Sequence, residues 1–411
     1  MLDKTNNIIE RVYKSFLPSG AEAVKLKRIA ESVIAGIRAK ATKYKLDVEV
    51  ELGGSFSKGT WVRNDADIDV FVVFGSEKET LGLHKLIPDG FDTAHGTRVY
   101  FRGKIQRVYV EIVPLVRFKD RKEVTNSVDF SRLHASYINR RLDAGMKRDV
   151  VALKQFCKAN GCFGAETHIH GFSGYALELM ILNYGGIKQL FDAVLAWRPC
   201  VYIDIEKVYS NRDGAVKELG EDGSPILLVD PTNPNRNVCA SLNMTNFAKF
   251  VFAVKFFHLH PEMSFFLKKD DKKAIISRSK LRGTRLFRNV TRISGPREKF
   301  LSKYNKNSER LLKTLSDAGV EVYDLNVVFS EHDAELFLEV ANVPATKTKR
   351  VVGPNPWLGI EHFSRFVNQH REAYVYKESA AYDKPYDVHD FNKFILGKIK
   401  EYMAQKAILR E

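Results

Sequence analysis

The sequence predicts an α+β multidomain protein, in which a mixed sheet precedes a helical middle and an α+β C-terminal region. The chain has 411 residues, 44% of them apolar, which is enough for two to four domains with a core in each. Helical periodicity dominates the middle, and strand-like runs occur near both ends. We therefore expect three domains, at residues 1–140, 141–258 and 259–411.

The first domain is predicted from one helix and three strands. Residues 20–47 carry apolar side chains at steps of three and four between lysines and glutamates, and Pro18 and Ser19 mark the start of this helix. The run LDVEVEL alternates apolar and charged residues and ends at Gly53 and Gly54, as a strand does. Residues 67–74 and 107–116 are predicted to be two further strands, the former buried.

A change in the periodicity of apolar residues predicts the second and third domains. Helical runs dominate from 141 to 258, notably DVVALKQFCKAN, GYALELMILNY and NFAKFVFAVKFF. Beyond them, the strand-like runs VEVYDLNVVFS and ELFLEVANV alternate with helical runs. The last third is therefore predicted to be α+β.

Charge and composition narrow the class of protein. The formal net charge of +15 favours an anionic partner such as nucleic acid, a ribosome or an anionic membrane surface. No apolar run reaches 18 residues, and the N-terminus lacks the order of a secretory signal, so we expect a cytoplasmic protein that binds no membrane. The four cysteines form no Cys-x-x-Cys pair, which argues against a zinc ribbon or a disulfide framework.

The stretch GGSFSKGTWVRNDADIDVFVVF, residues 53–74, contains the chemically informative pattern. Asp67 and Asp69 are two residues apart in a predicted strand, so both carboxylates leave the same face of the sheet. Two adjacent carboxylates repel one another in a poorly hydrated site, and a divalent cation removes that repulsion. Oxygen ligands without a nearby Cys or His favour Mg²⁺.

The glycines upstream of these aspartates predict a phosphate-binding turn. Gly54 and Ser55 lie between a strand and a short helix, where the backbone can close on a ligand. Backbone amides there can bind a triphosphate, assisted by the Ser55 hydroxyl and the Lys58 ammonium group.

The predicted strand RVYVEIVPLV supplies a third carboxylate, Glu111. Three carboxylates can hold two Mg²⁺ ions, one activating an attacking 3′-hydroxyl and the other binding the leaving pyrophosphate, which is nucleotidyl transfer. The competing interpretation is that these acids are surface residues of a hairpin. A hairpin would not need the preceding glycine turn.

Residues 53–74 resemble the signature of the polymerase-beta-like nucleotidyltransferase superfamily. The sequence GGSFSKGTW followed by DIDVFVVF resembles the archaeal-type (class I) CCA-adding enzymes in particular. The resemblance extends to DFSRLHASYI (129–138), LKQFCKANGCFGAETHIHGFSGYALELMI (153–181) and VDPTNPNRNVCASLN (229–243), so it covers roughly two thirds of the chain. It implies a palm-like nucleotidyltransferase domain at 1–140, a base-recognising helical domain at 141–258 and a tRNA-binding region at 259–411.

The resemblance also implies roles for individual residues. His134 and Lys154 would contact the nucleotide, and Arg236 would help to recognise the incoming base. The family usually has Asp where this chain has Glu111, one methylene longer. It typically has a nucleotide-contacting tyrosine where this chain has Phe163, which keeps the stacking area but lacks the hydroxyl.

The implied reaction adds C, C and A to the 3′ end of tRNA from CTP and ATP, with Mg²⁺ and without a nucleic-acid template. The chain would bind the acceptor and TΨC arms of tRNA by shape, and the resemblance is also compatible with a homodimer. Basic residues between 266 and 298 are candidates for this contact, although a solvated charged face is an equal alternative. The candidates named are Lys268, Lys269, Lys273, Arg278, Arg282 and Arg285.

The residues alone are also compatible with other functions. The same chemistry would serve a poly(A) polymerase or an oligonucleotide or cyclic-nucleotide synthase, and a non-catalytic RNA-binding relative is a third class. Arg236 could instead form a structural ion pair with Asp230, and Lys154 could be a solvated charge.

Overall fold

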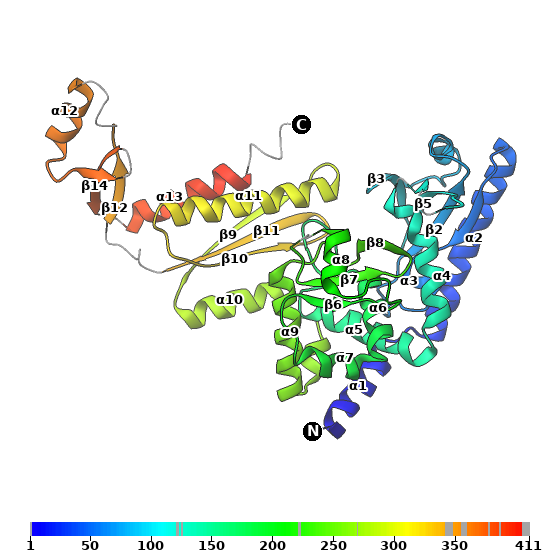
Figure 1. Cartoon of the computed structure of the whole chain (residues 1–411). Helices are drawn as coiled ribbons and strands as arrows, with labels where there is room; N and C mark the ends of the chain where they lie inside the picture. Colours follow the sequence, from blue (N-terminus) through cyan, green and yellow to red (C-terminus); the bar gives the residue numbers. More distant parts are fainter. Residues whose placement is uncertain are drawn as a thin grey trace. The chain divides into compact units, whose positions relative to one another are not determined.

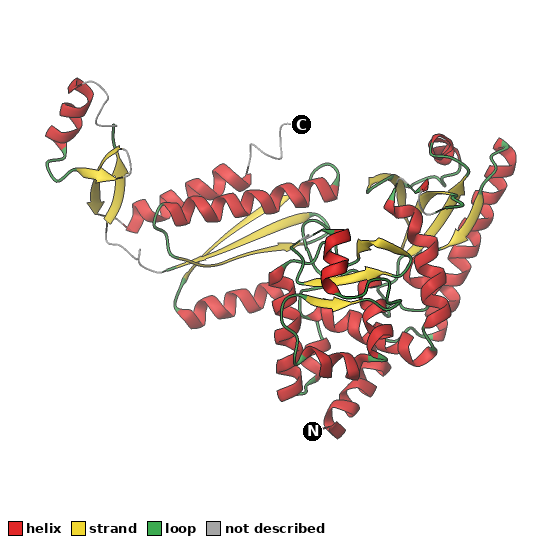
Figure 2. Ribbon diagram, in the orientation of Figure 1, coloured by secondary structure: helices red, strands yellow, loops and turns green. Residues whose placement is uncertain are grey.

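The computed structural model describes residues 2–404, apart from 121–122, 125, 221–222, 269, 342–347, 355–359, 377–378 and 386–387. The chain divides into two compact units, Met1–Lys268 and Lys269–Glu411 (Figure 1). This division lies near the boundary expected after residue 258, and the boundary expected after residue 140 stays a prediction. The α+β class is confirmed, with helices and strands in both units (Figure 2).

The N-terminal sheet of the first unit has five strands in the order β1-β2-β5-β4-β3. Strand β1 pairs antiparallel with β2, β2 pairs parallel with β5, and β4 pairs antiparallel with both β5 and β3. The bounds are Glu49–Leu52 for β1, Ile68–Phe74 for β2, Asp92–His95 for β3, Val99–Ile105 for β4 and Val108–Val116 for β5. The three strands predicted from the sequence are present, and β3 and β4 were missed.

The two faces of this sheet differ. Ile68, Val70 and Val72 are buried against the long helix α2, Gly20–Tyr44, which the sequence had predicted. Ser19 caps that helix by accepting from the amide of Glu22. The alternate residues of β2, beginning with Asp69, therefore lie on the face turned away from α2.

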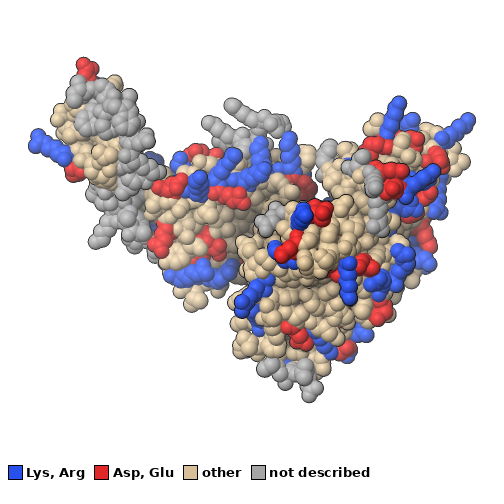
Figure 3. Space-filling model, viewed as in Figure 1, with Lys and Arg blue, Asp and Glu red and all other residues tan. Residues whose placement is uncertain are grey.

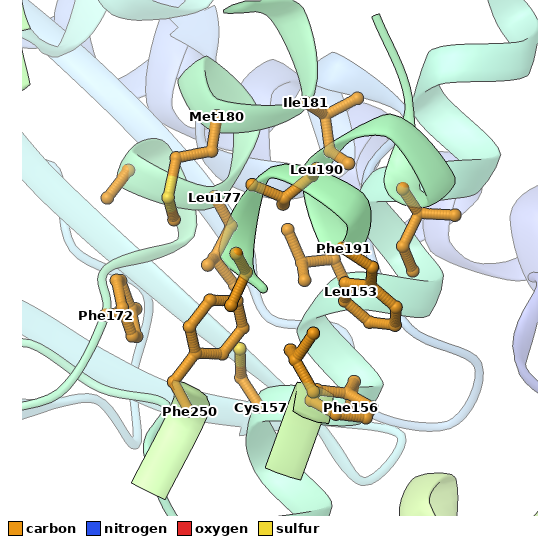
Figure 4. Close-up of a cluster of buried hydrophobic side chains, with 14 of the residues drawn as sticks. Leu153, Phe156, Cys157, Phe172, Leu177, Met180, Ile181, Leu190, Phe191 and Phe250 are labelled. Carbon is orange, nitrogen blue, oxygen red and sulfur yellow. The ribbon is translucent and has the colours of Figure 1, made fainter. Parts of the chain in front are cut away.

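Helices form most of the remainder of the first unit, and their apolar faces make one large core (Figure 4). Phe156 of α5 lies at its centre, with Phe191, Phe250 and Phe257 around it. The helices are α1 Leu2–Phe16, α3 Gly54–Lys58, α4 Ser131–Arg141, α5 Ala144–Ala159, α6 Gly174–Tyr184, α7 Ile187–Val194, α8 Arg212–Leu219 and α9 Met244–Leu259.

A small three-stranded sheet lies among these helices and was not predicted. Its order is β6-β7-β8, with bounds Val201–Ile203, Ile226–Asp230 and Asn233–Asn237. The turn between Asp230 and Asn233 contains Thr232, whose amide and hydroxyl bind the Asp230 carboxylate. The segment VDPTNPNRN is therefore a hairpin.

The second unit joins a three-stranded sheet, β10-β11-β9, to helices α11 and α13 through a shared core. A second sheet, β12-β14-β13, follows the first in the chain. The bounds are α10 Asp271–Arg282, β9 Arg285–Arg292, α11 Arg297–Asp317, β10 Val322–Phe329, β11 Asp333–Val340, β12 Thr348–Val352, α12 Ile360–Gln369, β13 Tyr374–Tyr376, β14 Ser379–Pro385 and α13 Val388–Ile399. Among the helices described, none combines the length and apolar character that crossing a bilayer requires.

Candidate active site

Strand register brings together the predicted carboxylates. Asp69 on β2 is the direct partner of Glu111 on β5, and Glu111 is the direct partner of Arg102 on β4. Directly paired residues share a face of a sheet, so these three side chains lie in a row across neighbouring strands. Asp67 lies immediately before β2.

The carboxylates form a site with excess negative charge. Burial, with Glu111 and Asp67 nearby, raises the pKa of Asp69 to about 7. Burial also raises the pKa of Asp67 above its ordinary value. A set of oxygen donors whose ionisation is opposed in this way fits a divalent cation, because such an ion would stabilise the charged forms.

Arg102 belongs to the site as well, although no sequence motif marks it. Its Nε lies 3.2 Å from Glu111 Oε1, and its Nη2 lies 3.7 Å from Asp67 Oδ2. Its guanidinium also stacks on the ring of Tyr109, at 4.0 Å. Within the described ranges, no three His, Cys, Asp or Glu side chains are already gathered as ligands for a metal ion. Asp67 and Glu111 instead share the Arg102 guanidinium.

The glycine turn lies directly against the Asp69 carboxylate. Gly54 has φ of +62°, and a Cβ added there would lie 1.5 Å from Asp69 Oδ2. The amide of Gly53 donates to the Asp69 carbonyl at 2.7 Å. Glycine is therefore required at position 54, both for its backbone conformation and for space. Ser55 follows Gly54 in the first turn of α3.

Lys58 and Lys154, both expected to contact the nucleotide, lie together in the interior. Lys58 Nζ donates to Glu178 Oε2 at 2.6 Å, and Lys154 Nζ donates to Glu178 Oε1 at 3.1 Å. Thr60 donates to the same carboxylate at 2.6 Å. Lys154 is thus not a solvated charge, since only 4% of it is exposed.

His134 and Arg236 meet at Asp230. His134 Nε2 lies 3.1 Å and Arg236 Nη1 lies 3.0 Å from Asp230 Oδ2, and Tyr175 donates to Oδ1 at 3.1 Å. Although burial opposes it, the hydrogen bonds from His134 and Thr232 keep the pKa of Asp230 below its ordinary value. The ion pair between Arg236 and Asp230, weighed as an alternative, is therefore present. Arg236 remains partly exposed, at 37% of its side chain.

Two aromatic residues border this arrangement. Tyr175 stacks on His134 with ring centroids 4.0 Å apart, and Lys58 Nζ lies 5.9 Å from the Tyr175 ring. Tyr175 thereby connects the lysine group to the Asp230 group. Phe163 packs against the helical core, and Lys158 Nζ lies over its ring at 4.7 Å. Lys158 also forms an ion pair with Asp65.

The six basic candidates in the second half differ in their surroundings. Arg282 donates to the buried Glu339, and Arg285 donates to Asn392. Lys273 and Arg278 are exposed on α10, over which Lys and Arg side chains gather (Figure 3). Lys268 is exposed at the end of the first unit, and Lys269 lies outside the described residues.

Comparisons with known proteins agree with this geometry. A family described as "Nucleotidyltransferase domain" matches residues 36–132, and one described as "tRNA nucleotidyltransferase, second domain" matches residues 148–267. A solved structure of a cytoplasmic RNA terminal U-transferase has a TM-score of 0.50 at 14% identity, covering 66% of this chain and 99% of that one. This likeness shows the fold alone.

Curated relatives identify the family. The CCA-adding enzyme of Nanoarchaeum equitans is 29% identical over 93% of this chain and 94% of its own length. That of Saccharolobus solfataricus is 30% identical over 92% of this chain and 90% of its own length. The chain therefore belongs to the archaeal-type CCA-adding enzymes, which are tRNA nucleotidyltransferases.

Proposed function

We propose that this enzyme completes the 3′ end of tRNA with C, C and A, and that Asp67, Asp69 and Glu111 are its catalytic carboxylates. The direct pairing of Asp69 with Glu111, beside a turn that only glycine fits, carries this assignment. These oxygens would hold Mg²⁺, two ions in the arrangement we favour. Bound there, the metal would activate the tRNA 3′-hydroxyl and neutralise the triphosphate of CTP or ATP.

The side chains around the carboxylates would bind and orient the nucleotide. The backbone at Gly54 and Ser55 would accept the triphosphate, and Lys58 and Lys154 would supply positive charge beside it. Burial lowers the pKa of His134, although Asp230 opposes this shift, and so favours a neutral imidazole that would offer hydrogen bonds without charge. Arg236, held by Asp230, would present its remaining donors to the base, and Phe163 would offer stacking area.

The substrate tRNA would bind through its acceptor and TΨC arms. Exposed cations on α10 are the part of the basic surface best placed to contact phosphates, since Arg282 and Arg285 already have internal partners. A cytoplasmic location and a homodimer stay predictions of the same proposal.

A single incorporation assay tests the activity. The enzyme is incubated with labelled CTP or ATP and a tRNA that lacks its 3′ end. We expect addition that stops after C, C and A. Long homopolymer tails would indicate a poly(A) polymerase instead, and no incorporation would indicate a non-catalytic RNA-binding protein.

Reversing two charges on α10 should weaken tRNA binding. For Lys273→Glu with Arg278→Glu, we expect the slope of log K against log salt to fall by about 2, because each phosphate contact contributes about 1. The measurement is tRNA affinity at several salt concentrations. Lys27→Glu with Arg28→Glu, exposed on α2, makes the same change of net charge elsewhere. If both variants bind tRNA equally well, α10 does not contact tRNA.

A further inference from the structure

Glu178 is a fully buried carboxylate in an otherwise apolar helix. It lies on α6 between Leu177 and Leu179, both at 0% exposure, and its own exposure is 0%. Figure 4 shows Leu177 and Met180 of the same helix inside the hydrophobic core. An ionised carboxylate in such surroundings is strongly unfavourable unless charged partners compensate it.

The partners of Glu178 come from two other elements of the site. Its Oε2 accepts from Lys58 of α3 at 2.6 Å, and its Oε1 accepts from Lys154 of α5 at 3.1 Å. Thr60, just after α3, donates to Oε1 at 2.6 Å, and it accepts from Lys154 through its hydroxyl at 3.1 Å and through its carbonyl at 3.0 Å. Lys154 therefore has three acceptors and would act on a ligand through its charge. Glu178 therefore ties the turn that contains Gly54 and Ser55 to the helical core.

The charges in this group do not balance. Lys58 and Lys154 bring two positive charges, and Glu178 is the one carboxylate hydrogen-bonded to either ammonium in the part of the chain that the structure describes. Asp69 also lies near Lys58, but it belongs to the row of carboxylates assigned to the metal ion. Although burial opposes it, the two lysines lower the pKa of Glu178 to about 2, so it is ionised. Burial lowers the pKa of Lys154 to about 8, which shows that its charge is only partly compensated. An anion beside the lysines would complete the balance.

We propose that Glu178 is a positioning residue, which holds the ammonium groups of Lys58 and Lys154 where the triphosphate of CTP or ATP binds. The inference rests on the proposed function, because it assigns the missing anion to the nucleotide. A carboxylate that orients a phosphate-binding lysine is an established arrangement in phosphoryl transfer.

Equilibrium binding of CTP without tRNA measures this role in the absence of turnover. For Glu178→Gln we expect the Kd for CTP to rise about tenfold to a hundredfold, as when a charge-assisted hydrogen bond is lost. Asp149→Asn is the matched control, because Asp149 of α5 accepts from Tyr13 and Ile187 in the same helical core, without contact to either lysine. Its Kd for CTP should equal that of the wild type, and an equal loss there would overturn the proposal.

The pH profile separates positioning from packing. Charged groups that face Lys154 are Glu178 on α6, Lys58 on α3 and Lys158 on its own helix. In the wild type, the Kd for CTP should rise as pH passes about 8, because Lys154 loses its proton. In Glu178→Gln the carboxylate that favours the ammonium form is gone, so this rise should begin at lower pH. An unchanged profile would overturn the proposal.

Failure of the inference can be told from failure of the proposed function. If the wild type adds no nucleotides to tRNA, the proposed function fails, whereas CTP binding still reports on Glu178. If the wild type is active and Glu178→Gln binds CTP as tightly, only the inference fails. Should Glu178→Gln not fold, Glu178→Asp keeps the charge. It should weaken CTP binding by less than about tenfold and keep the wild-type pH profile.

Discussion

Asp69→Asn should abolish nucleotide addition to tRNA, lowering kcat by about a thousandfold or more, while it stabilises the metal-free protein. The loss follows because metal-assisted stabilisation of the transition state amounts to several kcal/mol, and each 1.4 kcal/mol or so is a factor of ten in rate. The measurement is the initial rate of CTP incorporation into tRNA that lacks its 3′ end.

The same substitution should stabilise the metal-free protein because it removes a carboxylate whose ionisation opposes folding. The pKa of Asp69 in the folded protein is about 7, above its ordinary value of 3.8, so ionisation of this side chain opposes folding. Stability of the metal-free wild type should therefore fall as pH rises from about 4 to about 7. Asparagine removes that cost. Because the Asp69 side chain is partly exposed and solvent screens its charge, we expect the free energy of unfolding to rise by roughly 1–3 kcal/mol. Urea unfolding at pH 8 in the presence of EDTA measures it.

Asp65→Asn is the control for both effects. Asp65 belongs to the same segment, but it pairs with Lys158 and lies outside the row of paired strand residues. We expect its rate to stay within about threefold of the wild type. Equal losses in the Asp65 and Asp69 variants would contradict a specific role for Asp69.

Asp230→Ala should unfold the first unit more readily, by about 3–5 kcal/mol, because it leaves several buried partners without their acceptor. The carboxylate has 0% exposure and accepts from His134, Arg236, Tyr175 and Thr232. Arg236 would also lose the contact that orients it. We therefore expect the preference for CTP over UTP to fall, and the ratio of the two kcat/KM values measures it.

Asp204→Ala provides the matching control. Asp204 follows β6 of the same small sheet and accepts from the amide of Tyr209 and the hydroxyl of Tyr202, whereas Asp230 accepts from His134, Arg236, Tyr175 and Thr232. It is only partly buried, so the cost should be about 1 kcal/mol and the nucleotide preference should not change. If the two variants lose the same stability, the buried group around Asp230 is not the determinant we describe.

The elements with strong periodicity could be predicted from the sequence. Helix α2 and strands β2 and β5 carry apolar residues at spacings that no other structure satisfies as well. Strands β3 and β4 were missed because their residues, DTAH and VYFRGKI, lack clean alternation. The β7 and β8 hairpin was missed because NPNRN has the composition of a loop and becomes a strand through pairing with β7.

The site could be predicted where the pattern within a single strand identifies its residues. Asp67 and Asp69 follow from spacing, and Glu111 from being the one acid in its strand. Arg102 was missed because its relation to Glu111 depends on pairing between β4 and β5. Glu178 did leave a signal, since a single acid in the apolar run GYALELMIL has to be buried and paired. Its partners, more than a hundred residues away in the case of Lys58, could not be read from that run.

The contact between Gly54 and Asp69 couples the glycine turn to strand β2. A methyl group at position 54 would occupy the place of a carboxylate oxygen, so changing the turn also displaces the acid on the neighbouring strand. The turn proposed to bind the triphosphate and the strand proposed to bind the metal ion are therefore expected to move together. Such coupling would keep the bound triphosphate and the bound metal ion at a constant separation.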